Sequence, residues 1–510
     1  MTGTLTSYTQ NHGGRVIVLF LLFLLALYQF YSFGFTAFAA VCLIPLIAIF
    51  LFLAIKHQNA LFWYIFTMNY FVMGLQRYGY IPLPITVVAV LPQILLLMSL
   101  IVIQRPSKIS MMNPMLLAII LWTFYLILQV FNDTCGLPLS IGDWLMNMNF
   151  YAFYFIMAFV IINKIINTPE SIMRFLRLLA YFSIAAAFWA WRQQTFGWDN
   201  SENAWLMSGA MRTHIIGGSI RYFSFFSDAA NFGCNIGSVA VAFYILTLTS
   251  KLRKDKLLFL IAALCSTYGF FSSGTRSGLM CFLVGTVLYV FLSKSVKLTS
   301  IVLIFGGLFV FFLAFTDIGN GNMQIRRMRT AFDSNDASKN VRDINKASMK
   351  KYLKDAPFGI GINIDESCVP AFNKYIIVRD TPNDSTYVFF WQRTGIVGVY
   401  VFAAMNILIL LGGCFVTLFR LKNKACKGIS AAFCCAFLAI QAGGYANHIL
   451  LQYPNIIIFY GGMAIVYLLP AIEQDFIAYE DKLFAIQEEK RRLRLEKKKQ
   501  SRVKSWFSWK

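Results

Sequence analysis

Long apolar runs, each followed by a short polar turn, constrain the fold of this chain more than any other feature. Runs such as 16–33, 83–103 and 395–419 approach or exceed the roughly 20 residues that cross the hydrocarbon core of a bilayer. Only 13% of the 510 residues are charged, about half of the share that soluble domains carry. Because a backbone in lipid must satisfy its hydrogen bonds internally, the pattern predicts an all-α polytopic membrane protein.

We predict a transmembrane domain in residues 1–472 with about fourteen spans. Their approximate bounds are 16–33, 35–55, 60–76, 83–103, 114–131, 146–163, 177–196, 230–249, 257–273, 279–293, 298–316, 395–419, 428–447 and 455–472. The first run is long enough to remain as a span, and no small-residue cleavage site follows it, so we expect no cleaved signal peptide.

The distribution of charge predicts the orientation of the spans. The net charge is +22, but most Lys and Arg residues lie in alternate short loops, such as 250–256 and 419–427, and in the tail. This is the positive-inside pattern, and it disfavours a nucleic acid as partner. We therefore expect both termini in the cytoplasm. Residues 473–510 are predicted to form a basic amphipathic tail that meets membrane lipids.

The largest extramembrane piece between spans is 316–393, which we predict to be a folded loop on the periplasmic side. A helix is expected from about 335 to 356, because Pro357 ends it. Cys135 and Cys368 are placed on the same side, and a disulfide between them is a minor alternative. The ten cysteines have no spacing typical of metal ligands.

Arg276 lies in the turn "SSGTRSG" between two apolar runs. An ion at membrane depth is costly and usually faces a cavity or a counter-ion. Gly274 lets the backbone approach a ligand, and Ser277 offers a hydroxyl. A guanidinium among such groups suits a phosphate or pyrophosphate. The alternative is an arginine that snorkels to the interface and closes a tight turn.

Two further stretches have polar groups at the outer membrane edge. Arg221 precedes "FSFFSDAANFG", in which Asp228 is either part of an anion site or a simple helix cap. The second stretch combines "PFGIGIN", with Gly359 and Gly361, and the later "STYVFFWQRTGIVG".

Together these stretches resemble the O-antigen ligase/polymerase superfamily over roughly residues 200–460. The signals are an Arg ahead of "FSFFSDAANFG", the "SSGTRSG" turn, a loop helix with Arg342, "PFGIGIN" and "RTGIVG", in that order. The resemblance implies a membrane-embedded glycosyltransferase, similar to the type C fold, that needs neither metal nor cofactor. Such an enzyme takes a glycan from undecaprenyl pyrophosphate at the periplasmic face of the bacterial inner membrane.

The acceptor is left open by the resemblance. We favour an O-antigen ligase with a lipid A–core acceptor. The alternatives are a polymerase that extends carrier-linked repeats and a transferase that glycosylates proteins. Outside the superfamily, a polysaccharide transporter is the main rival, but it predicts charges along a central path rather than arginines at one face. A scaffold protein would leave those arginines unexplained.

The resemblance also implies roles for individual residues. Arg221 and Arg276 are expected to stabilise the departing pyrophosphate. Asp384 stands where the family pattern has a His, and a buried carboxylate can act as the base in its place; a capping role is the alternative, and His448 or His214 could substitute. The expected substrate-binding residues are Gly274, Ser277, Arg342, Gly359, Gly361, Ser385, Tyr387, Arg393 and His448.

Overall fold

The computed structural model describes residues 21, 24, 28, 49–79, 86–103, 108–109, 113–216, 218–330, 337–383 and 385–507. Most of the first two predicted spans, and Asp384, lie outside these residues. The chain divides into two units, Met1–Tyr64 with Val90–Arg105, and Ile65–Ala89 with Pro106–Lys510. In the first unit, the Gln58 amide donates to the backbone oxygen of Ser99 over 3.1 Å.

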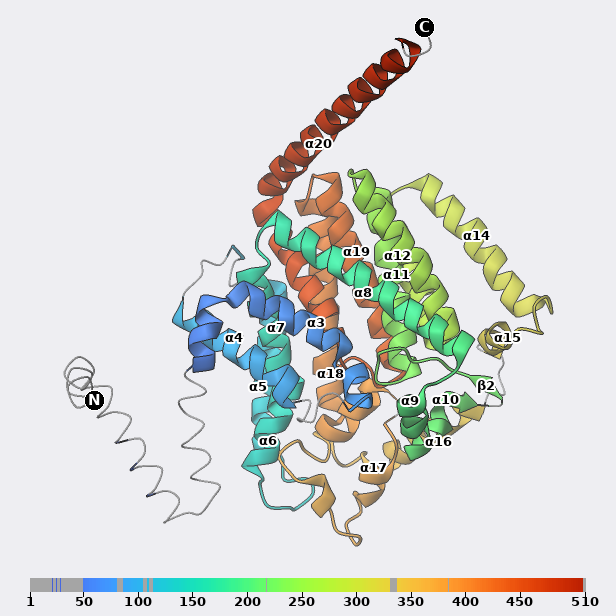
Figure 1. The fold of residues 1–510 in the computed structure, drawn as a ribbon. Helices are drawn as coiled ribbons and strands as arrows, with labels where there is room; N and C mark the ends of the chain where they lie inside the picture. The colour runs from blue at the N-terminus through green and yellow to red at the C-terminus, as the bar shows by residue number, and fades with distance from the viewer. Residues whose placement is uncertain are drawn as a thin grey trace, which may run out of the picture. The chain divides into compact units, whose positions relative to one another are not determined.

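Most of the described part of the second unit is helical (Figure 1). Helix α3 (Gln58–Arg77) enters it, and α4 (Leu91–Val102) belongs to the first unit. The elements that follow are α5 (Pro114–Leu128), α6 (Ile141–Met148), α7 (Tyr154–Ile165), α8 (Pro169–Phe196), α9 (Asn200–Trp205), α10 (Met211–His214), β1 (Ile215–Ile216), β2 (Ser219–Ile220), α11 (Ala229–Thr249), α12 (Arg253–Ser272), α13 (Arg276–Ser293), α14 (Val296–Phe315), α15 (Met323–Arg329), α16 (Ala337–Tyr352), α17 (Ile376–Asp380), α18 (Thr386–Phe415), α19 (Lys424–Ala446) and α20 (Gly461–Phe507). The two strands pair antiparallel.

Nine helices in the described residues are long and apolar enough to cross a membrane. A tenth candidate is the pair Ile49–Lys56 and Gln58–Arg77, which is bent by 101°. The all-α polytopic membrane fold is therefore confirmed, while the count of fourteen stays a prediction. One predicted boundary was wrong for a local reason: the span expected to begin at 395 begins at Thr386, because Ser385 caps the helix and Gly395 only breaks it.

Small residues allow α11 and α13 to touch through their backbones. A Cβ atom on Gly278 would lie 2.7 Å from the carbonyl oxygen of Gly233, and one on Gly237 would lie 2.5 Å from that of Gly278. Because real Cβ atoms do not approach so closely, both helices need glycine here. This contact brings the start of α13, with Arg276, against the start of α11.

The segment between α14 and α18 is folded, as expected. Buried side chains of α16 and of the chain after it, including Met349, Leu353, Ile360 and Val378, form one core with Cys135 from another loop. The loop helix is shorter than predicted, since α16 ends at Tyr352. Cys135 is buried, Cys368 is exposed, and both are free thiols.

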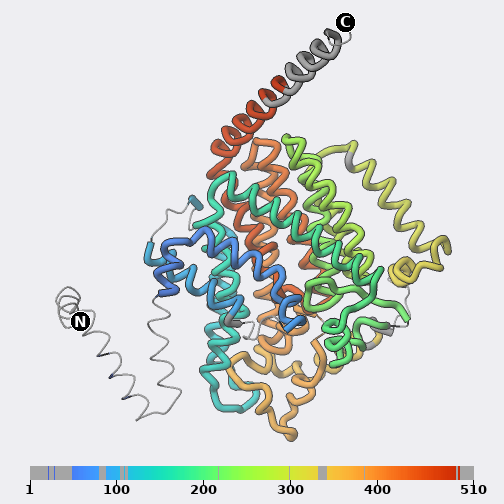
Figure 2. Tube along the Cα trace, viewed as in Figure 1, coloured from blue at the N-terminus to red at the C-terminus, as the bar shows by residue number. Residues whose placement is uncertain are grey.

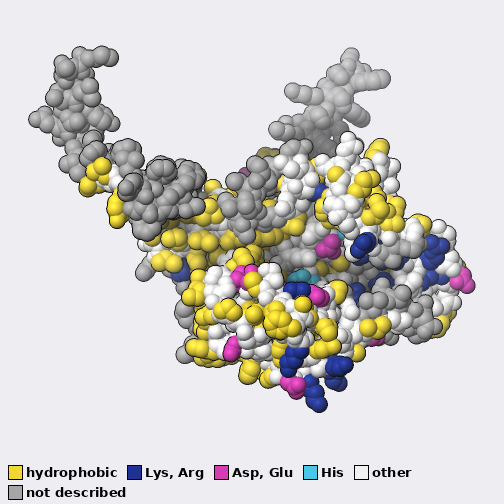
Figure 3. Space-filling view, turned by 90° about the horizontal axis from the view of Figure 1, so that it is seen from below, with side chains coloured by type: hydrophobic (Ala, Val, Ile, Leu, Met, Phe, Trp, Pro, Cys, Tyr) yellow, Lys and Arg dark blue, Asp and Glu magenta, His cyan; other side chains and the backbone are white. Residues whose placement is uncertain are grey.

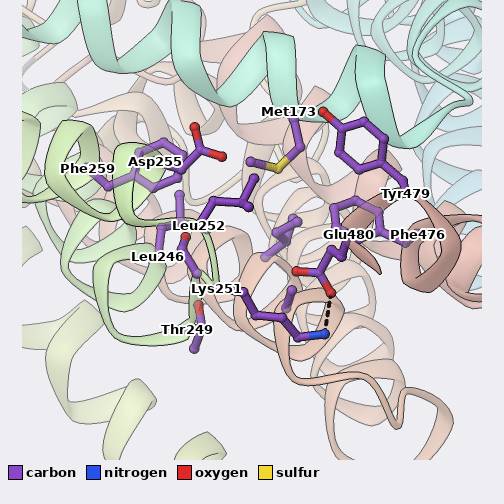
Figure 4. Close-up of a pocket in the computed structure, with 13 residues that line it drawn as sticks. Met173, Leu246, Thr249, Lys251, Leu252, Asp255, Phe259, Phe476, Tyr479 and Glu480 are labelled. Atoms are coloured by element: carbon purple, nitrogen blue, oxygen red, sulfur yellow. Dashed lines mark ion pairs between the residues drawn. The ribbon is translucent and has the colours of Figure 1, made fainter. Parts of the chain in front are cut away.

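The predicted C-terminal tail continues the last span as one helix, α20, which leaves the bundle (Figures 1 and 2). Acidic residues hold its middle part against the loops at that end. Glu480 pairs with Lys251 over 3.0 Å, and Glu473 accepts from the backbone N–H of Asn423. Nearby, the pair of Asp255 and Arg177, at 2.8 Å, joins α12 to α8. Figure 4 shows Glu480, Lys251 and Asp255 around a small pocket below α8.

Candidate functional site

Two arginine side chains lie against the turn at Gly274, and a third arginine, whose charge acts on one of them, follows in the chain. A Cβ atom on Gly274 would lie 3.3 Å from Cδ of Arg327 and 3.4 Å from Cγ of Arg221. The Nε atom of Arg327 donates to the Gly274 carbonyl oxygen over 2.5 Å. Arg276 follows two residues later, in the first turn of α13. Gly274 has a φ of +57° and no Cβ atom. The aliphatic parts of Arg221 and Arg327 therefore fit beside it, close to Arg276 in the chain. We call Arg221, Arg276 and Arg327 the arginine cluster.

Arg221 is half-buried and held by hydrogen bonds on two sides. Its Nη1 atom donates to the Thr213 carbonyl oxygen over 2.8 Å, and its Nη2 atom donates to Oγ1 of Thr275 over 2.9 Å. Within the described part of the chain, its buried Nε atom has no hydrogen-bond partner. Burial lowers the pKa of the guanidinium, and the positive charges of Arg276 and Arg342 lower it further, while Asp228 raises it. The protein thus keeps a cation and an unused donor in a partly dry place, as an anion site requires.

Arg276 is held from the other side of the cluster. Its Nη1 atom donates to the backbone oxygen of Thr330 over 3.1 Å, just after α15 ends. The side chain is half-buried and stands at the N-terminus of α13, where the helix dipole adds positive potential. Arg342, in α16, is also half-buried, and its charge acts on Arg221. The loop segment therefore brings α15 and α16 to the arginine cluster.

A turn after α19 joins the starts of α13 and α18. The Asn447 amide donates to Oγ of Ser277 over 2.6 Å, and the Thr386 amide N–H donates to the Asn447 carbonyl oxygen over 3.2 Å. Oγ1 of Thr386 in turn accepts from the backbone N–H groups of Ile449 and Leu450. Ser277, predicted to bind substrate, is thus a hydrogen-bond acceptor in this junction. Its role toward substrate stays a prediction.

His448 belongs to this turn and has an unused nitrogen. Its ring centroid lies 4.5 Å from that of Phe389, and its buried Nδ1 atom has no hydrogen-bond partner among the residues that the structure describes. Burial lowers the pKa of His448 to about 4, with Asp228 raising it and Arg393 lowering it. The imidazole is therefore neutral near pH 7 and able to accept a proton. Basic, acidic and histidine side chains are visible around a hollow on the lower face (Figure 3).

His214, in contrast, uses both ring nitrogens. Its Nδ1 atom lies 2.8 Å from the Ala210 carbonyl oxygen, and its Nε2 atom lies 3.2 Å from the backbone nitrogen of Ala229. Since the Ala229 N–H can only donate, Nε2 accepts and Nδ1 carries the proton. Burial lowers the pKa of His214 to about 4. The neutral ring therefore accepts a hydrogen bond at the start of α11. Asp228 caps the same helix by accepting from the backbone N–H groups of Ala230 and Asn231.

A close contact between Gly359 and Gly395 joins two of the motifs, "PFGIGIN" and "RTGIVG". A Cβ atom on Gly359 would lie 2.4 Å from the amide nitrogen of Gly395, and both glycines have φ near +70°. The backbone N–H groups of Ile360 and Gly361 donate to the carbonyl oxygens of Gln392 and Arg393. The loop thus docks onto the backbone of α18 where the helix is broken. A substrate-binding role for Gly359 and Gly361 stays a prediction.

The remaining predicted residues line the same part of α18. Ser385 caps the helix by accepting from the backbone N–H of Val388. The Tyr387 hydroxyl donates to Oε1 of Gln441 over 3.1 Å, so it points into the bundle. Arg393 forms an ion pair with Glu366, and its positive charge lowers the pKa of the nearby His448. Arg393 therefore already has an acidic partner.

Arg327 was missed by the sequence analysis. It belongs to the basic run "RRMR" (326–329), which falls in a segment placed on the periplasmic side. The positive-inside rule disfavours such a run there, and this conflict was the available signal. Its neighbour Arg326 is exposed. The sequence does not distinguish the two arginines, and only the tertiary structure shows that Arg327 contacts Gly274. Asp384 lies outside the described residues, and its role stays a prediction.

A comparison with known protein families finds a match over part of the chain. Residues 261–403 match the family model described as O-antigen ligase. The matched region contains the "SSGTRSG" turn, Arg327, Arg342 and Arg393, whereas Arg221 and His448 lie outside it. No curated protein matches the chain. In the described residues, no group of three or more His, Cys, Asp and Glu side chains is placed to hold a metal ion.

Proposed function

We propose, on the premise that residues 261–403 place this chain in the O-antigen ligase superfamily, that it transfers a glycan from undecaprenyl pyrophosphate to a lipid A–core acceptor. The match supports a membrane glycosyltransferase of the O-antigen ligase or polymerase type. The identity of the donor, the acceptor and a mechanism without metal or cofactor are our proposal.

The observation that carries the proposal is the arginine cluster around Gly274. Breaking the bond between C1 of the sugar and the phosphate oxygen leaves charge on the pyrophosphate. Guanidinium groups bind phosphate oxygens with paired, charge-assisted hydrogen bonds. In a partly dry site, such fixed donors stabilise the developing charge more than water does. The buried, unused Nε atom of Arg221 is a donor that a phosphate oxygen would satisfy.

The acceptor hydroxyl must lose a proton as its oxygen bonds to C1. Asp384 remains the base that the family pattern suggests. Support for His448 comes from a ring that is neutral near pH 7, whose Nδ1 atom has no partner among the described residues, and on which Asp228 and Arg393 both act. A neutral histidine can take the proton, and Asp228 would stabilise the resulting cation.

The site is proposed to face the periplasm, with both termini in the cytoplasm. The arginine cluster lies at the N-terminal ends of α11 and α13, while the basic loops 250–256 and 419–427 lie at the opposite ends of the helices. That asymmetry supports the orientation through the positive-inside rule.

Transfer can be tested with the purified chain, a carrier-linked glycan and lipid A–core. Arg327→Gln should lower kcat on the order of a hundredfold, the usual loss for one transition-state donor. Arg326→Gln is the matched control, because the exposed neighbour has the same charge, and it should keep near-normal activity. Equal activity of both variants would remove the arginine cluster from the chemistry.

Deletion in the native host, followed by gel analysis of surface glycans, separates ligase from polymerase. A ligase deletion removes all polymer from lipid A. A polymerase deletion leaves single repeats attached, and that result would overturn the proposed acceptor.

A further inference from the structure

Four lysines surround a second cavity that the proposed transfer does not use. The cavity has a volume of about 590 Å³. It is lined in part by the side chains of Lys294, Lys422, Lys424 and Lys427, and we call it the lysine cavity. All four lysines are exposed. None of them forms an ion pair with a carboxylate within the described residues.

The lysine cavity is far from the arginine cluster. Helix α11 begins beside Asp228 and ends at Thr249, which lines the cavity. Helix α13 begins at Arg276, and Ser293 at its end also lines the cavity. A helix of this length spans about 30 Å. One phosphate therefore cannot occupy both sites, and any ligand of the lysine cavity is separate from one bound at the arginine cluster.

Local energetics at the cavity oppose two of the four lysines that line it. Lys424 and Lys427 stand in the first turn of α19, which carries no acidic residue. Cations are unfavourable at this end of a helix because the dipole is positive there. An anion in the cavity would offset the repulsion.

The nearest acidic side chains are already engaged. Oε1 of Glu473 accepts from the backbone N–H groups of Lys422 and Asn423. Glu480 accepts from Lys251 and from the side chain of Asn423. Both carboxylates thus hold α20 to the loop, and no acid lines the lysine cavity.

The other half of the lining is apolar and indicates the kind of anion. Leu248, Tyr289, Leu292, Leu418 and Ala431 form this half. A free inorganic anion gains nothing from such a surface, whereas an acyl chain does. Basic pockets between helices at the cytoplasmic side suit anionic lipid headgroups. We propose that the lysine cavity binds an anionic phospholipid, with the headgroup phosphate among the lysines and an acyl chain on the apolar half.

Lipid binding can be measured by native mass spectrometry of the purified full chain with added phosphatidylglycerol or phosphatidylcholine. The test variant replaces all four lysines of the cavity by glutamine. Each lysine near a headgroup contributes about fivefold in affinity, so phosphatidylglycerol should bind at least tenfold more weakly. Binding of phosphatidylcholine should not change. Because the four lysines are exposed, the melting temperature should stay close to that of the wild type.

The matched control removes four other exposed basic residues from outside the cavity: Arg253, Lys254, Lys256 and Lys297. This control should keep its affinity for phosphatidylglycerol within twofold. If both variants lose affinity equally, general charge explains the binding and the proposal fails. Wild-type affinity in the test variant would also overturn it.

A competition experiment distinguishes the two sources of phosphate. Inorganic phosphate in millimolar excess should leave phosphatidylglycerol bound, because it cannot replace the acyl contacts. Complete displacement by inorganic phosphate would show a site for a free anion and would overturn the proposed lipid. This outcome is independent of glycosyl transfer, since neither probe enters that assay.

Discussion

Replacing Gly274 by alanine should test the arginine cluster through backbone geometry, without changing any charge. At a φ of +57°, an L-residue costs about 1 kcal/mol relative to glycine. The new Cβ atom would also lie 3.3 Å and 3.4 Å from the stems of Arg327 and Arg221. These contacts are tight enough to push both guanidiniums by a few tenths of an ångström. Displacement of catalytic groups approaching 1 Å can cost about a hundredfold in rate. We expect a loss of roughly tenfold in kcat with the fold intact.

Gly136→Ala is the matched control for this substitution. Gly136 has nearly the same φ, +60°, and a Cβ atom there would meet nothing within 4 Å. The control therefore carries the backbone strain without the contact to the arginines. Both variants should lose similar stability, measured by thermal unfolding in detergent, but only Gly274→Ala should lose transfer activity. If the two variants had equal activity, the glycine would matter only for the turn, and the inferred crowding of the cluster would be wrong.

Four further predictions concern the remaining residues. Arg276→Lys should fold but lose most activity, because lysine keeps the charge and loses the planar two-point contact; near-normal transfer would leave Arg276 as a turn residue. Asp384→Asn should abolish transfer if Asp384 is the base, and Asp384→His should restore part of it; an active Asn variant supports capping. If His448 is the base, activity should be constant near pH 7 and fall as pH approaches about 4, because only the neutral ring accepts the proton; His448→Gln should then remove the activity, and an unchanged profile in that variant would exclude the role. Impermeant reagents applied to intact cells should label a cysteine placed in 316–393 but not one in the tail, and the reverse would invert the proposed orientation.

The lowered pKa of His448 also has a consequence for stability. Its folded-state pKa of about 4 lies below the usual value near 6.5, so the unfolded state binds more protons between these pH values. Stability should therefore decrease as pH falls through this window. His448→Gln should show less of this decrease than the wild type when unfolding is followed at pH 7 and at pH 5. Burial lowers the pKa of His214 in the same way. Replacing His214 by Gln should therefore also reduce the loss of stability between pH 7 and pH 5.

Features that depend on neighbours along the chain were predicted from the sequence alone. A helix in lipid satisfies its hydrogen bonds within one segment, so hydropathy placed spans such as 114–131 and 230–249 close to the observed helices. The folded segment between α14 and α18 followed from its length and its aromatic residues. The order of the short motifs indicated the superfamily, and the match of residues 261–403 to the O-antigen ligase family model supports it.

Features that depend on contacts between distant residues required the tertiary structure. Arg327 joins the arginine cluster across 53 positions from Gly274, and nothing local separates it from Arg326. Gly359 and Gly395 must both be glycine because their two backbones are in close contact. His448 and His214 look alike in the sequence, yet only packing leaves one ring nitrogen free and uses both in the other. Hydropathy and spacing describe each segment by itself, whereas the chemistry arises where segments pack against one another.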